Sequence, residues 1–328
     1  MSNKKIRWGI LATGSIARVF AADLKLLPEA ELTAVGSRSK ASADKFADEF
    51  DIPLRFGSYA ELAACPDVDA IYIATPHPFH KENTVMCLNA GKAVLCEKPF
   101  AMNAREAQEM IDAAKSNGVF LMEAMWVRFT PLFQKVRQWV TDGLIGNVRL
   151  IQSDFGFHSK RGVDSRVFRP DLGGGSLLDV GIYPISMASF IYGCQPETIQ
   201  SSLRFGHTGV DEQAAMIFSY NGGKMAVLSS AITLWTQRET LIFGTKGFIH
   251  IYGPWHQLQK VCVHVNDEDT IETFPRLGRG YGYQALEVMN CLREKRTEST
   301  IMPLSETLEI IKTLDTIRSQ WNFKYPTE

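Results

Sequence analysis

Short apolar runs alternate with longer amphipathic stretches over roughly the first 120 residues. The apolar runs predict buried strands, and they lie at residues 6–11, 31–36, 70–74, 93–96 and 119–122. Between them, residues 42–50, 78–90 and 103–117 carry apolar side chains at helical spacing. Buried strands separated by helices predict an α/β fold, a parallel sheet wound by right-handed crossovers.

After about residue 125 the pattern changes to strands that follow one another. Residues 148–157 alternate between two faces, as an antiparallel strand does. Further strand-like segments lie at 198–205, 213–220, 224–233, 240–243, 248–252 and 261–265, and helical patterns at 283–295 and 304–322. Strands behind an α/β alternation predict a second domain of α+β type. We therefore expect two domains, residues 1–124 and 125–328.

The first apolar run opens into a glycine-containing turn. Gly14 and Ala17 stand at the second and third positions of the dinucleotide fingerprint, where small residues admit a pyrophosphate and close helix packing. Alanine makes such a turn only where φ is negative, so Ala12 at the first position weakens the match. A strand-turn-helix without a ligand is the alternative. The residues expected to contact the cofactor here are Ala12, Thr13, Gly14, Ser15 and Ile16.

The end of the second strand indicates which dinucleotide is bound. An NAD site carries an Asp or Glu about 20 residues after the turn, to bind the ribose 2′-hydroxyl. Ser37 and Arg38 occupy that place, with Lys40 close behind. A guanidinium and a hydroxyl suit a 2′-phosphate, so we expect NADP, with NAD as the second choice. In the alternative interpretation, Arg38 and Lys40 form a solvated cluster at a helix start.

Two later predicted strands end in residues that could bind the cofactor or take part in catalysis. Glu97, Lys98 and Pro99 follow the run 93–96, and ligands of open parallel sheets bind beyond the carboxyl ends of strands. This places an ammonium beside the cofactor and indicates an enzyme. Ala74 ends the run 70–74, and Thr75, Pro76, His77 and His80 follow it. We expect these residues to contact the cofactor, and His77 to face either the nicotinamide ribose or the mouth of the substrate pocket. The two histidines lack a third ligand, so no metal site is predicted.

Several segments together resemble the Gfo/Idh/MocA oxidoreductase family along essentially the whole chain. They are residues 9–17 (GILATGSIA), 74–76 (ATP), 97–99 (EKP), 173–183 (GGGSLLDVGIY) and 244–247 (GTKG). Tyr183, with residues 122–129 (MEAMWVRF), resembles the branch that contains dimeric dihydrodiol dehydrogenase and NADP-dependent D-xylose 1-dehydrogenase. The resemblance implies a Rossmann domain, then a domain with a large, mostly antiparallel sheet whose exposed face often joins subunits. We therefore expect a homodimer or homotetramer.

The resemblance also implies the catalytic groups. Tyr183 is expected to be the acid/base, with Lys98 lowering its pKa and stabilising charge on the substrate oxygen. The alternatives are a structural ion pair for Lys98 and a half-buried packing role for Tyr183. Asp179, four residues before Tyr183, is expected either to orient substrate hydroxyls or to cap the helix. The implied reaction is reversible hydride transfer between NADP and a hydroxyl-bearing carbon of a sugar, polyol or cyclic diol.

Four further residues are candidates for the substrate pocket. Trp126 and Arg128 offer an aromatic platform and a guanidinium, or else a packed tryptophan beside a solvated arginine. Phe155 lies on the strand-like segment 148–157, and His158 directly follows this segment. Trp126 and Arg128 are also predicted to contact the cofactor.

The composition of the chain argues against some classes of binding partner. Hydrophobic residues make up 45% and charged residues 22%, and the formal net charge is -1. These values predict that no nucleic acid is bound. No apolar stretch approaches the roughly 20 residues that a membrane helix needs, so no membrane helix is predicted. Six dispersed cysteines without a Cys-x-x-Cys pair, and no apolar leader, lead us to expect a cytoplasmic protein. A dinucleotide-binding sensor or transcriptional co-regulator without turnover is the alternative function.

Overall fold

The computed structural model describes residues 4–257 and 259–328, which form two compact units. Unit 1 comprises Met1–Phe129 and Leu277–Leu308, and unit 2 comprises Thr130–Arg276 and Glu309–Glu328. The predicted ranges 1–124 and 125–328 did not include the return of the chain to unit 1. There α8 (Gly282–Arg293) packs against α1 (Ser15–Leu24).

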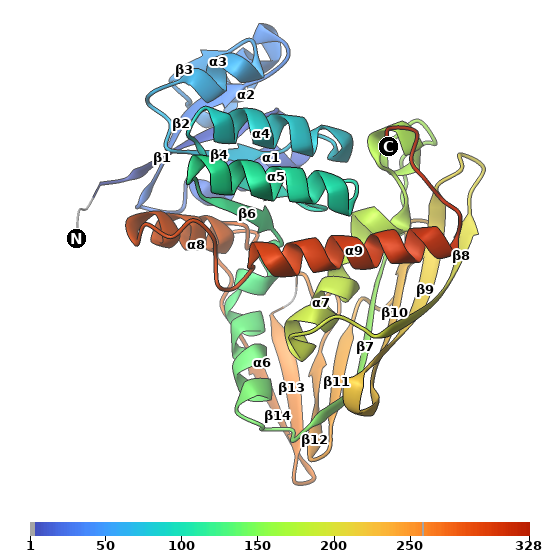
Figure 1. Cartoon of the computed structure of the whole chain (residues 1–328). Helices are drawn as coiled ribbons and strands as arrows, with labels where there is room; N and C mark the ends of the chain where they lie inside the picture. The colour runs from blue at the N-terminus through green and yellow to red at the C-terminus, as the bar shows by residue number, and fades with distance from the viewer. Residues whose placement is uncertain (1–3, 258) are drawn as a thin grey trace. The chain divides into compact units, whose positions relative to one another are not determined.

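Unit 1 is a six-stranded parallel sheet in the order β3-β2-β1-β4-β5-β6. This order is that of the doubly wound dinucleotide-binding fold, which confirms the α/β prediction. The strands are β1 (Ile6–Leu11), β2 (Ala30–Gly36), β3 (Leu54–Phe56), β4 (Ala70–Ile73), β5 (Ala93–Glu97) and β6 (Leu121–Ala124). The remaining helices are α2 (Lys40–Phe50), α3 (Tyr59–Ala64), α4 (His80–Asn89) and α5 (Ala104–Asn117), and α4 lies beside α5 (Figure 1).

Aromatic packing fixes α1 against the sheet of unit 1. Phe20 stacks on Tyr72 of β4 with ring centroids 3.8 Å apart, and Trp8 of β1 meets Phe20 edge-on at 5.5 Å. All three side chains are fully buried. Because α1 follows directly from the glycine turn, this packing also fixes the turn at the carboxyl end of β1.

Unit 2 is an eight-stranded mixed sheet in the order β14-β13-β12-β11-β7-β10-β9-β8. Its strands are β7 (Val148–Gly156), β8 (Thr198–Phe205), β9 (Asp211–Tyr220), β10 (Lys224–Ala231), β11 (Thr240–Gly244), β12 (Gly247–Ile251), β13 (Lys260–Val265) and β14 (Glu268–Thr273). β7 pairs in parallel with β10 and antiparallel with β11, and the other pairs are antiparallel. The mostly antiparallel sheet is confirmed, and the strand predicted at 148–157 is antiparallel to β11 but parallel to β10.

The helices of unit 2 are α6 (Pro131–Thr141), α7 (Ile182–Tyr192) and the C-terminal part of α9 (Leu304–Gln320), and α7 packs on β7 and β10 (Figure 1). The opposite face of the sheet exposes apolar side chains. Ile217 and Val227 are cross-strand partners, and they are 40% and 41% exposed. Met225 and Ile271 are also exposed. We call these four residues the open apolar face.

One helical stretch among the described residues has the length and composition of a membrane span. It is Pro170–Tyr192, with 23 residues, and the mean hydropathy of its most apolar 18-residue window is 1.2. The prediction that no apolar stretch approaches 20 residues is therefore wrong, since short helical turns join α7 into one run. The most apolar window of this run is entirely buried inside the protein, as expected for a core helix.

Candidate active site

The turn after β1 has the geometry of a phosphate-binding turn. Ala12 has a φ of 86°, so the prediction that alanine needs a negative φ here is wrong. The Ala12 amide donates to the Gly36 carbonyl (2.9 Å) and the Ala74 amide to the Leu11 carbonyl (3.0 Å). These bonds from both neighbouring strands hold the left-handed conformation, which costs a non-glycine residue about 1–3 kcal/mol.

The start of α1 leaves room for a ligand. Gly14 is the N-cap residue and no side chain caps the helix. A methyl group added at Gly14 would meet no atom within 4 Å, so the first turn, with Ser15 and Ile16, faces open space. Amides at a helix start suit a pyrophosphate. Arg18, which the sequence reading missed, donates to the Thr13 carbonyl (2.5 Å) and steadies the turn.

The end of β2 separates the roles of Arg38 and Lys40. Lys40 forms an exposed ion pair with Asp44 one helical turn on, so for Lys40 the solvated-cluster interpretation holds. Arg38 is exposed beside Tyr59 of α3, and its guanidinium opposes the rise in the Tyr59 pKa that burial causes. Ser37 is buried at the strand end, where its amide donates to the Phe56 carbonyl (3.2 Å). No carboxylate stands at residues 37–39.

His80 joins the tips of β4 and β5. Its ring is fully buried, with Nδ1 2.8 Å from the Pro99 carbonyl oxygen and Nε2 2.9 Å from that of Thr75. Because both neighbours are acceptors, both contacts are hydrogen bonds only when both ring nitrogens carry protons. His77 lies in the short helical turn just after Pro76, and its ring centroid is 5.7 Å from that of His80.

The turn that carries Lys98 is fixed on both sides. The buried Glu97 carboxylate accepts hydrogen bonds from the Tyr72 hydroxyl and from the Lys98 amide (3.2 Å). The Lys98-Pro99 peptide bond is cis. The next amide, Phe100, donates to the Glu123 carboxylate (3.2 Å). The backbone amides of Lys98 and of Phe100, two residues later, are therefore both held by buried carboxylates.

Glu123, which the sequence reading missed, is fully buried at β6, beside Cys96 of β5. Burial raises its pKa to about 7, an effect that the Arg128 guanidinium opposes. The only sequence signal was a carboxylate inside an apolar strand.

Trp126 and Arg128 are both buried in unit 1. Trp126 stacks on Tyr281 with centroids 4.5 Å apart, and the Tyr281 amide donates to Asp23 of α1 (2.7 Å). Arg128 is 2% exposed and pairs with Glu306 at 2.9 Å, so the interpretation of a solvated arginine is wrong. Tyr281 had no sequence signal, since it lies far along the chain from its partner.

In unit 2, Asp179 and Tyr183 lie at the start of one continuous helical stretch. Asp179 is within a π-helical turn (Leu177–Gly181), and Tyr183 is the second residue of α7. This helical stretch therefore begins with a turn wider than that of an α-helix. Asp179 pairs with Arg166 at 2.6 Å. Sequence analysis favoured Arg169 as a weak pocket candidate and missed Arg166, whereas Arg169 pairs with Asp171 instead.

Aromatic rings surround Tyr183 within unit 2. The Phe155 centroid is 5.1 Å from that of Tyr183, and the Trp255 centroid is 6.0 Å away. The His256 ring stacks on that of Phe155, with centroids 4.4 Å apart. Phe155 was predicted as a pocket residue, whereas Trp255 and His256 were missed. His158 lies just beyond β7, in a β-bridge with Thr233.

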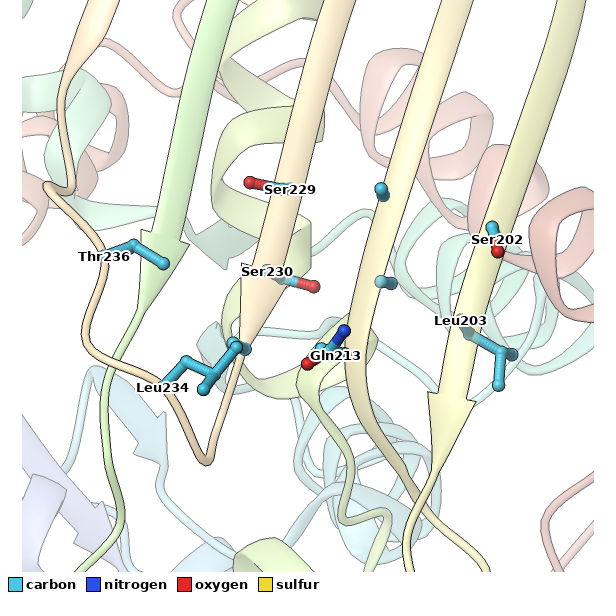
Figure 2. A pocket seen from close by; sticks show the side chains of 10 residues that line it. Ser202, Leu203, Gln213, Ser229, Ser230, Leu234 and Thr236 are labelled. Carbon is cyan, nitrogen blue, oxygen red and sulfur yellow. The ribbon is translucent and has the colours of Figure 1, made fainter.

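The predicted residues thus fall into two groups. The cofactor turn, Arg38, His77, Lys98 and Trp126 belong to unit 1, and Asp179, Tyr183, Phe155 and His158 to unit 2. None of them lines the hollow at the ends of β8, β9 and β10 (Figure 2). Within residues 4–257 and 259–328, no group of three His, Cys, Asp or Glu side chains could hold a metal ion.

Comparison with known proteins gives consistent matches over the whole chain. Residues 6–125 match the GFO_IDH_MocA model, described as an oxidoreductase family with an NAD-binding Rossmann fold, and residues 133–250 match the GFO/IDH/MocA C-terminal domain. Mouse (Mus musculus) trans-1,2-dihydrobenzene-1,2-diol dehydrogenase is 39% identical, covering 98% of this chain and 99% of its own.

Two solved structures share the fold. A 3-ketoreductase from Actinomadura kijaniata, in complex with NADP and TDP-benzene, is 25% identical with a TM-score of 0.86, covering 96% of this chain and 98% of its own. Aldose-aldose oxidoreductase from Caulobacter crescentus, complexed with glycerol, is 24% identical with a TM-score of 0.89, covering 96% and 97%.

Proposed function

The chain belongs to the Gfo/Idh/MocA oxidoreductase family, and from this we propose that it is an NADP-dependent dehydrogenase of cyclic diols or sugars. The family and the NAD(P)-binding Rossmann domain confirm the prediction of a dehydrogenase. The observation that carries the finer proposal is the fixed Lys98 turn at the tip of β5. It lies in the same sheet as the phosphate-binding turn of β1.

The proposed chemistry assigns one task to each residue. When bound, NADP would accept the hydride that leaves the carbon bearing the hydroxyl. Tyr183, as phenolate, takes the hydroxyl proton as the carbonyl forms. The Lys98 ammonium stabilises the negative charge on the substrate oxygen and on the phenolate. Arg166 holds the Asp179 carboxylate, which orients a second hydroxyl.

The surroundings of Tyr183 favour a cyclic substrate. Phe155 places apolar ring surface beside the phenol, with the fully buried Trp255 packed against Phe155, and Asp179 supplies a hydrogen-bond acceptor four residues before Tyr183. Flat apolar surface with one polar group suits a ring that carries adjacent hydroxyls. The mouse relative is named for such a diol, so trans-dihydrodiols come first in the substrate panel and aldoses second.

The preference for NADP rests on the end of β2. Arg38 and Ser37 stand where an NAD enzyme carries a carboxylate, and a guanidinium binds a phosphate with charge-assisted hydrogen bonds. The 3-ketoreductase relative was solved with NADP, which supports the same choice.

We also propose that two copies associate through the open apolar face. Ile217, Met225, Val227 and Ile271 are exposed on one side of an eight-stranded sheet. A flat apolar face of this kind marks an interaction surface, and a second copy offers a surface of the same composition.

The test of the function is NADP reduction at 340 nm with trans-dihydrodiols, aldoses and inositols. We expect turnover with one class of cyclic substrate and a lower KM for NADP than for NAD. Tight NADP binding without turnover on any of them would instead favour a dinucleotide-binding sensor.

A further inference from the structure

A glycine turn in unit 2 leads directly into the helix that carries Asp179 and Tyr183. Its last glycine, Gly175, has a φ of 116°. A Cβ atom at Gly175 would lie 2.1 Å from Oδ1 of Asp211. Glycine is therefore required here both by the backbone conformation and by the carboxylate that occupies the space beside it.

Asp211, the first residue of β9, is 1% exposed. Its Oδ2 accepts hydrogen bonds from the Leu177 amide (2.6 Å) and the Ser176 hydroxyl (2.8 Å). The Ser176 hydroxyl is also 3.1 Å from that of Ser230 on β10, which Figure 2 labels near Gln213. The first amide of the π-helical turn is thus bonded to a carboxylate in the sheet.

The other side of the glycine turn is held as well. The buried Tyr325 hydroxyl donates to the Gly174 carbonyl (2.7 Å). The Gly175 amide donates to the Val167 carbonyl (2.9 Å), in the segment that also contains Arg166, the partner of Asp179. The glycine turn and the helix start that follows it are therefore bonded to the sheet through Asp211, to the C-terminal segment through Tyr325 and to the loop that contains Val167.

We propose that Asp211 is a positioning residue, whose buried carboxylate sets the orientation of the helix start that carries Asp179 and Tyr183. Asp179 lies two residues after Leu177, and Tyr183 lies six residues after it. A carboxylate at the start of a helix is also favoured by the helix dipole. This inference rests on the proposed function, because it assigns Asp211 a task in the chemistry of Tyr183.

The ionisation of Asp211 gives the proposal a distinct pH dependence. Burial raises its pKa to about 7, and the bonds from Ser176 and Leu177 oppose this rise. The titratable groups that face it are the Tyr325 phenol and, through it, Asp179, Arg318 and Glu328. A protonated carboxyl accepts more weakly than a carboxylate, so the helix start is held less firmly below neutral pH. We expect kcat to fall on the acid side with an apparent pKa near 7.

Protein stability should respond in the opposite direction. The pKa of Asp211 in the folded protein lies above the ordinary aspartate value of 3.8, so the folded state binds more protons than the unfolded state between pH 4 and 7. The unfolding free energy therefore decreases as pH rises through this range. Neutral pH would then give the better-ordered site and the less stable protein.

The experiment compares Asp211→Asn with wild type, with Asp142→Asn at the exposed end of α6 as the control. We expect Asp211→Asn to lower kcat at least tenfold at pH 8, to abolish the acid limb near pH 7, and to leave the Kd for NADPH within twofold. Hydrogen exchange of residues 177–183 should become faster. The control should match wild type in all four measurements.

Unchanged exchange of residues 177–183, or an unchanged acid limb, would overturn the positioning role. Should Asp211→Asn fail to fold, Ser176→Ala removes one donor and keeps the carboxylate. Ser176→Ala should speed hydrogen exchange in the same segment and lower kcat several-fold. A Ser176→Ala protein with the hydrogen exchange and kcat of wild type would overturn the proposal. If wild type turns over no substrate, the proposed function fails separately, and hydrogen exchange still decides whether Asp211 orders the helix start.

Discussion

Arg38 is the residue on which the coenzyme preference depends. We expect Arg38→Ala to raise the KM for NADP by about 10- to 100-fold, because a charge-assisted hydrogen bond contributes roughly 1.5–3 kcal/mol. The KM for NAD should change less than twofold. Lys40→Ala is the matched control, since Lys40 pairs with Asp44 in solvent. An unchanged KM for NADP in Arg38→Ala would show that the 2′-phosphate is bound elsewhere.

Residues in local motifs could be predicted from sequence, and their distant partners could not. Gly14, Lys98 and Tyr183 stand out because short motifs place them at strand or helix ends. Tyr281 and Asp211 each act on a segment far away in the chain, and neither is in a motif of its own. Ala12 shows a further limit, because its positive φ follows from bonds to both neighbouring strands.

At the level of elements, Glu123 links β6 to the turn of Lys98. Its pKa of about 7 in the folded protein lies above the ordinary glutamate value of 4.5, so the free energy of unfolding of wild type decreases as pH rises from about 4.5 to 7. Glu123→Gln keeps an acceptor for the Phe100 amide and does not ionise. From pH 5 to pH 8 the stability of the variant relative to wild type should improve by up to about 3 kcal/mol.

Urea denaturation at the two pH values measures this difference. Glu109→Gln, on the exposed side of α5, should show no such change. A stability difference between Glu123→Gln and wild type that does not vary with pH would mean that Glu123 does not titrate in this range.

Hydrophobic periodicity located most elements to within a few residues, but not their irregularities. β3 has three residues and β14 is polar and mostly exposed, so neither has a clear apolar pattern. The composition of the π-helical turn at 177–181 would suit an α-helix equally well, and the bond of its first amide to Asp211 comes from a distant strand. The parallel pairing of β7 with β10 depends on strand order, which periodicity does not encode.

At the scale of the whole molecule, the open apolar face should control association. Val227→Lys places a charge at its centre, opposite Ile217, and should convert a dimer or tetramer to a smaller species in light scattering. Leu26→Lys, which changes an exposed apolar residue of unit 1, should leave the mass unchanged. A monomeric wild type, or a Val227→Lys protein of unchanged mass, would contradict association through this face.

The division of the chain was the least predictable feature at this scale. The helical pattern at 283–295 was visible, but not that 277–308 returns to unit 1. Hydrogen bonds from the Arg279 and Tyr281 amides to Asp23 accompany this return, and the first of them joins positions 256 residues apart.

The most direct test of the central claim measures kcat and NADPH affinity together in Tyr183→Phe and Lys98→Met. Phenylalanine keeps the ring beside Phe155 and removes only the hydroxyl. We expect both variants to lose at least 100-fold in kcat, in line with the usual contribution of a positioned acid/base, while Tyr183→Phe binds NADPH as wild type does. A Tyr183→Phe enzyme with wild-type turnover on the preferred diol or sugar would contradict the account.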